Sequence, residues 1–96
     1  MTEIESKALE ESIRLNIELQ KLMNNKSFKE IILNGFIEKG IKGCMAALPF
    51  AMTDDSKKRL HSNLEAIAKL QAYLKSIEST ARDAKEALEA TEEEVE

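Results

Sequence analysis

The chain has 96 residues, a formal net charge of −4, and a composition that is 43% hydrophobic and 33% charged. A pI of about 5.1 excludes the strongly basic class of nucleic-acid-binding domains, whose pI exceeds about 9. One histidine and one cysteine exclude an intrachain disulfide and a structural zinc site, which needs about four nitrogen or sulfur ligands. A domain this small buries only about two thirds of its unfolded surface, so a second subunit would add much to its core.

The apolar residues never alternate with period two, so we expect no β-sheet and an all-α fold. Helical periodicity predicts three helices, at about residues 3–23, 28–48 and 54–93. No internal repeat and no long linker divides the chain, so the sequence indicates a single domain over residues 1–96. The expected protomer is a helical hairpin or three-helix unit with a long C-terminal helix.

The first predicted helix starts with a capping box, in which the Thr2 hydroxyl accepts a backbone N–H of the first turn and Glu5 reaches back. Its apolar residues cover two adjacent sides of the helix, a wide arc that suits contact with two neighbours in a bundle. They are Ile4, Ala8, Leu15, Leu19 and Leu22 on one side, and Leu9, Ile13 and Ile17 on the other.

The second predicted helix follows a second capping box, Ser27 with Glu30, and is apolar on most sides. Gly40 and Gly43 interrupt it before Pro49 ends it. Two interpretations are open: Gly40 caps the helix and a short second piece follows, or the helix continues with small residues facing a neighbour. We favour a break near Gly40.

The third predicted helix begins at Thr53 as a cap and carries a heptad seam from residue 60 onward. Its first half, residues 60–74, has a broad apolar face that we expect to pack on the first two predicted helices. After Ile77 the seam narrows to alanines, which we expect to pair with another copy. Because the rest of the chain is too short to cover a helix of about 60 Å, we expect a homodimer or homotetramer. The residues expected at the oligomer interface are Ile67, Leu70, Leu74, Ile77, Ala81, Ala84 and Leu88.

No catalytic or metal site is predicted, and no cofactor. Cys44 and His61 could in principle form a nucleophile and base, but both lie on predicted helices with nothing to form an oxyanion hole. A small core cysteine and a solvated surface histidine are the expected roles of these two residues.

A basic cluster, Lys57-Lys58-Arg59, stands in the first turns of the third predicted helix, where the helix dipole disfavours cations. One interpretation is a solvated run balanced by Asp54 and Asp55. The other is an anion site, since backbone N–H groups at a helix start bind phosphate. The residues predicted for such a site are Lys57, Lys58 and Arg59 with Lys39 or Lys42 for the anion, and an aromatic face such as Phe36, Phe50 or Tyr73 for stacking a base.

Residues 25–36 read Asn-Lys-Ser-Phe-Lys-Glu-Ile-Ile-Leu-Asn-Gly-Phe. They resemble the pattern N-x-D-F-K-x-x-I-L-x-G-Y of a widespread family of small helical bacteriophage proteins. As in that family, an I-x-x-L-x-x-Y-L segment follows, here at residues 67–74, and then a long acidic helix. The chain departs from the pattern at Ser27, which replaces Asp and keeps a cap, and at Phe36, which replaces Tyr and loses a hydroxyl.

The resemblance implies a phage origin and therefore the cytoplasm of an infected bacterial cell. Small phage proteins of this build are virion assembly components or counter-defence proteins, and the latter include oligomeric sponges that sequester cyclic nucleotide immune signals. The expected function is sequestration of a small phosphorylated ligand such as a cyclic dinucleotide, without catalysis. A virion assembly protein and an inhibitor that binds a host protein are the alternatives. Neither membrane association nor general nucleic-acid binding is expected.

Overall fold

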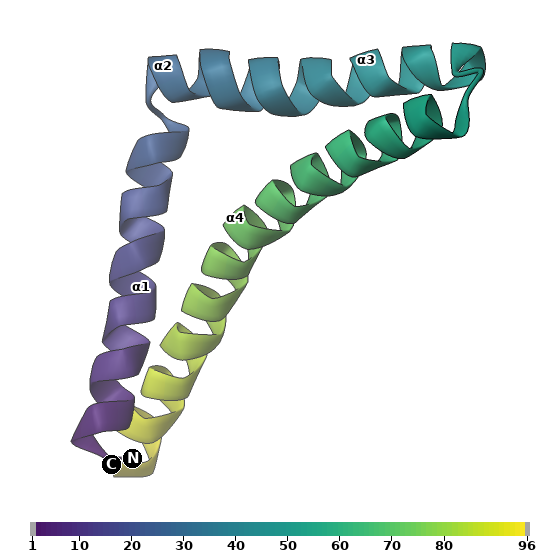
Figure 1. Cartoon of the computed structure of the whole chain (residues 1–96). Helices are drawn as coiled ribbons and strands as arrows, with labels where there is room; N and C mark the ends of the chain where they lie inside the picture. Colours follow the sequence, from purple (N-terminus) through teal and green to yellow (C-terminus); the bar gives the residue numbers. More distant parts are fainter. Residues whose placement is uncertain (1, 96) are drawn as a thin grey trace. The chain divides into compact units, whose positions relative to one another are not determined.

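The computed structural model describes residues 2–95, with side chains up to residue 91, and their backbone leaves helical geometry after residue 2 only at residues 24–25 and 51–53. No strand occurs in this part of the chain, which confirms the all-α fold. The elements, in chain order, are α1 Glu3–Met23, α2 Lys26–Phe28, the π-helix η1 Lys29–Lys39, α3 Gly40–Ala47, the 3₁₀ turn η2 Leu48–Phe50, and α4 Asp54–Val95 (Figure 1).

Side-chain caps explain where the helices begin. The Glu5 N–H donates to Thr2 Oγ1 at 3.1 Å, as the first capping box predicts. The predicted cap at Ser27 is wrong: the Phe28 N–H donates to Asn25 Oδ1 at 2.9 Å, and α2 begins at Lys26. Asn25 has extended backbone angles, φ −72° and ψ 125°, as an N-cap requires, whereas Ser27 is already helical.

The favoured break near Gly40 does not occur. Gly40 has φ −62° and ψ −46°, which are helical values, and the chain passes there from the π-helix η1 into α3. Only the hydrogen-bond register changes at this point, from the wide π-helix to the α-helix. Of the two interpretations left open by the sequence, the continuous helix is the correct one, and Gly40, but not the exposed Gly43, faces a neighbouring helix.

Contacts between residues divide the chain into two compact units, whereas the sequence indicates one domain. The terminal unit combines residues 2–22 with residues 74–95, and the central unit is residues 23–73. Both long helices, α1 and α4, contribute to more than one unit, so the division falls within helices and not at a linker.

In the terminal unit, α1 and the second part of α4 lie side by side (Figure 1). Leu19 of α1 is buried, as are Ala81 and Ala84 of α4, and Ala84 is only 2% exposed. Gln20 Nε2 donates to Glu78 Oε1 at 3.2 Å and links the two helices. The alanine seam, expected to face another copy, therefore packs against α1 of its own chain.

In the central unit, α3 and the end of η1 come close to the first part of α4 (Figure 1). A Cβ atom built on Gly40 would come within 2.8 Å of Ile67 Cδ1, so the backbone of α3 closely approaches α4. Ile37 and Cys44 are buried beside this contact, and Ile67 is 4% exposed. Ile67, another expected interface residue, is thus covered within the protomer.

Few side chains are buried in either unit. No described side chain is less than 2% exposed, and no buried side-chain nitrogen or oxygen among them lacks a hydrogen-bond partner. Large apolar side chains stay exposed in both units: Ile4, Leu15, Ile17, Leu22, Ile31, Phe36, Met45, Phe50, Met52 and Tyr73. Among the described residues, no helix is long and apolar enough to cross a membrane.

Candidate functional site

The basic cluster lies at the start of α4. Thr53 caps this helix, because its Oγ1 accepts the Ser56 N–H at 3.0 Å. Lys57, Lys58 and Arg59 follow in the first turns, and all three are exposed. Within residues 2–91 no ion pair involves any of the three, so Asp54 and Asp55 do not neutralise them by direct contact.

Arg59 lines an open pocket of about 490 Å³ at the turn that leads into α4. Phe50, on η2, contributes an aromatic ring that is 79% exposed, and Ser56 contributes a hydroxyl group. The lining residues are Ala47, Phe50, Ala51, Ser56, Arg59 and Leu60. The pocket therefore offers a guanidinium group, a hydroxyl group and an aromatic face to one ligand.

Apart from Phe50, the other predicted ligand residues are not gathered around Arg59. Phe36 lines a different groove of about 370 Å³, together with Gly35, Gly40, Cys44, Asn63, Ala66 and Ile67. Lys42 Nζ lies 3.1 Å from Glu38 Oε1 in an i,i+4 ion pair, which reduces its availability to an anion. Lys39 and Tyr73 are exposed. The predicted set thus contributes Arg59 and Phe50 to one pocket and Phe36 to another.

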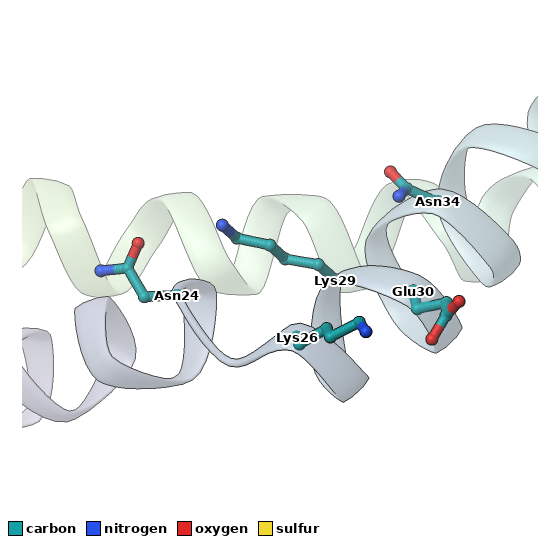
Figure 2. A pocket seen from close by; sticks show the side chains of 5 residues that line it. All are labelled: Asn24, Lys26, Lys29, Glu30 and Asn34. Carbon is teal, nitrogen blue, oxygen red and sulfur yellow. The ribbon is translucent and has the colours of Figure 1, made fainter.

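A third, polar pocket lies where α1 ends and η1 begins, and Figure 2 shows it from close by. It has a volume of about 330 Å³ and is lined by Asn24, Lys26, Lys29, Glu30 and Asn34. The Lys29 side chain extends toward Asn24, and the Lys26 ammonium group is directed toward Glu30 (Figure 2). This pocket was not predicted from the sequence, although a helix end at Asn24-Asn25 beside two lysines spaced i,i+3 is a signal for it.

The perturbed ionisable groups belong to the terminal unit. Arg14 Nε donates to Glu11 Oε2 at 2.9 Å, and the Arg14 Nη2 atom contacts the other carboxylate oxygen. This hydrogen bonding lowers the pKa of Glu11 and raises the pKa of Arg14. Both groups are fully solvated, so the pair marks a surface interaction on α1 and not a catalytic acid or base.

Neither metal-ligand clusters nor a thiol–imidazole pair stand out among the described residues. No group of three or more His, Cys, Asp or Glu there could hold a metal ion. Cys44 is buried and His61 is exposed, as expected for a core cysteine and a surface histidine.

No protein-family model matches the chain, and neither the curated proteins nor the solved structures give a significant match. The resemblance to the phage family therefore rests on the sequence pattern of residues 25–36 and 67–74 and on the acidic helix that follows. The structure gives two residues of the 25–36 pattern a physical role. Asn25 caps α2, and Gly35 lies where a Cβ atom would be 3.1 Å from the Glu30 carbonyl oxygen.

Proposed function

We propose that this chain is a non-enzymatic, homo-oligomeric protein that binds and sequesters a small phosphorylated ligand, with a cyclic dinucleotide as the best candidate. One observation carries the proposal: Arg59 and Phe50 line the same open pocket, next to the unpaired Lys57 and Lys58. A resemblance to phage proteins supports the immune-signal context of such a ligand.

The chemistry of the pocket suits a nucleotide. A guanidinium group binds phosphate oxygens through two parallel hydrogen bonds, and the backbone N–H groups at the start of α4 favour the same charge. An exposed phenylalanine ring stacks on a nucleobase, a contact worth about 1–3 kcal/mol per base. Phosphate and base recognition are therefore available from Arg59 and Phe50 within one pocket.

The charge distribution supports an anionic ligand on the central unit. Residues 23–73 hold eight Lys/Arg against five Asp/Glu, a balance of +3, whereas residues 2–22 and 74–95 hold six against twelve, a balance of −6. Opposite signs on the two units attract a small anion to the central unit and repel it from the terminal unit. The net charge of the whole chain is negative, so it would not by itself suggest that an anion prefers the central unit.

Calorimetric titration with a panel of cyclic di- and trinucleotides tests the proposal. We expect one of them to bind, and Arg59→Ala and Phe50→Ala each to weaken binding at least about tenfold, or 1.4 kcal/mol. Lys69→Ala is the matched control, because Lys69 is an exposed cation on the same unit and helix outside the pocket. Absence of heat across the panel, or equal binding by all four proteins, would refute the ligand site.

A protein partner is the second candidate, because the end of η2 and the turn after it expose two large apolar side chains, Phe50 and Met52. A virion assembly protein would then be present in purified particles at a fixed ratio to the main capsid protein. A host-protein inhibitor would instead be absent from particles and would co-purify with one host protein at a defined ratio. Substituting both side chains with Ser would abolish either association.

A further inference from the structure

Helix α1 carries a second heptad row that α4 does not cover. The row has the alternating four- and three-residue spacing of a and d positions, and all its members are exposed. They are Ile4, Ala8, Glu11, Leu15, Glu18 and Leu22. Ile4 is 82% exposed, Leu15 is 40% exposed and Leu22 is 44% exposed, so the apolar members lack cover within the chain.

We infer that this row, the α1 outer row, is where a second copy docks, through an antiparallel two-fold contact of α1 with α1. The inference rests on the oligomeric part of the proposed function and names its surface. It replaces the α4 seam as the site of assembly, since Ile67, Ala81 and Ala84 of that seam are already buried within one chain.

Charge spacing identifies the occupant as a second copy. Lys7, Arg14 and Lys21 flank the row on one side at seven-residue intervals, and Glu11 and Glu18 lie within it. When two copies run antiparallel with Leu15 level with the partner's Glu11, Arg14 lies beside that carboxylate. In the same register Lys7 lies beside the partner's Glu18, and Ile4 is level with the partner's Leu22. Each α1 helix thus supplies, from the row and its flank, both the acids and the bases that its partner needs.

The same spacing decides the orientation. A parallel pair in register would set each acid against its own copy, Glu11 on Glu11 and Glu18 on Glu18, at positions facing the partner. Like charges at such positions are destabilising. Antiparallel pairing removes both repulsions and keeps three heptads in contact along the 21 residues of α1, a length of roughly 32 Å.

The ion pairs already present on α1 do not oppose this contact. Within one chain Glu11 pairs with Arg14, and Glu18 Oε1 lies 3.2 Å from Lys21 Nζ. Both pairs are exposed i,i+3 pairs, which contribute little to stability and exchange partners at little cost. Docking places the same carboxylates between a cation of their own chain and one of the partner.

Two charge-reversal variants test the contact. Lys7→Glu with Arg14→Glu makes the α1 outer row and its flank acidic, and Glu11→Lys with Glu18→Lys makes them basic. Each variant alone should raise the dimer Kd at least about tenfold, because like charges then meet across the contact. An equimolar mixture should restore association as a heterodimer, measured by sedimentation velocity. All four residues are exposed, so circular dichroism should stay helical.

Glu5→Lys with Glu10→Lys is the matched control, because it makes the same charge change on α1 outside the row and keeps Glu3, the intrachain partner of Lys7. It should keep the assembly of the unaltered chain. Variants that keep that assembly, or a mixture without restored association, would overturn the inference while the oligomeric proposal stands. A monomeric unaltered chain at micromolar concentration would overturn both, and the nucleotide titration would remain an independent test of the ligand pocket.

Discussion

A Cβ atom on Gly40 would lie 2.8 Å from Cδ1 of Ile67, closer than real Cβ atoms approach other heavy atoms. Gly40→Ala gains up to about 1 kcal/mol of helix propensity, but it overpacks a contact with a buried Ile67 and costs about 1–3 kcal/mol. We expect a net loss of stability of about 0–2 kcal/mol in urea unfolding.

Gly43→Ala is the matched control for this contact, because no heavy atom lies within 4 Å of a Cβ at that position. We expect it to stabilise the chain by up to about 1 kcal/mol through helix propensity alone. Equal stabilisation by both glycine substitutions would show that α3 and α4 do not approach closely at Gly40.

Two substitutions test which residue caps α2, the observed Asn25 or the predicted Ser27. Asn25→Ala removes the acceptor of the Phe28 N–H and should destabilise the chain by about 1 kcal/mol. Ser27→Ala, at the cap position that sequence alone predicts, should change stability by less than about 0.5 kcal/mol, the usual effect of a surface substitution. Chemical unfolding of both variants gives the comparison, and a larger effect at Ser27 would contradict the observed cap.

Because alanines are buried in the terminal unit, we expect its stability to depend on side-chain size at those positions. Ala84→Leu should destabilise the chain by about 1–3 kcal/mol, because Ala84 is almost fully buried in the terminal unit and a larger side chain would overpack it. Ala90→Leu, on the same helix but exposed, should have little effect. Thermal unfolding compares the two, and tolerance of leucine at Ala84 would mean that α1 does not cover this part of α4.

The Glu11–Arg14 pair predicts a pH effect of defined sign. Because hydrogen bonding to Arg14 lowers the folded-state pKa of Glu11, the pair stabilises the chain above the usual carboxyl pKa of 4.5. This contribution disappears as pH falls through the lowered value. Arg14→Ala should raise the Glu11 pKa toward 4.5 in a carbon-13 NMR titration, and Lys7→Ala should leave it unchanged.

Local features of the fold were readable from the sequence because each depends on a few neighbouring residues. Helical periodicity placed α1 and α4, and Thr2 and Thr53 cap helices as their hydroxyl groups predict. The cap at α2 was misplaced because Ser27 and Asn25 are both good N-cap residues, and only backbone angles distinguish them.

The candidate site was only partly readable. Arg59 was predicted to bind an anion because a cation at a helix start is disfavoured by the helix dipole and suggests a functional role. Of the three aromatic candidates, Phe50 lines the Arg59 pocket, whereas Phe36 lines a different groove. The spacing of these residues along the chain does not reveal which aromatic ring lies beside the cation, because the turn after η2 determines it.

The sequence by itself determined that the chain is all-helical, where α1 and α4 begin, and that α4 carries a heptad seam. It could not determine the partner of that seam, because a heptad pattern specifies a helical neighbour without saying whether the neighbour belongs to the same chain. The tertiary structure decided this point: Ala81 and Ala84 pack on α1, and Ile67 packs on Gly40. These residues of the α4 seam are therefore buried within the chain, whereas the apolar residues of the α1 outer row are exposed.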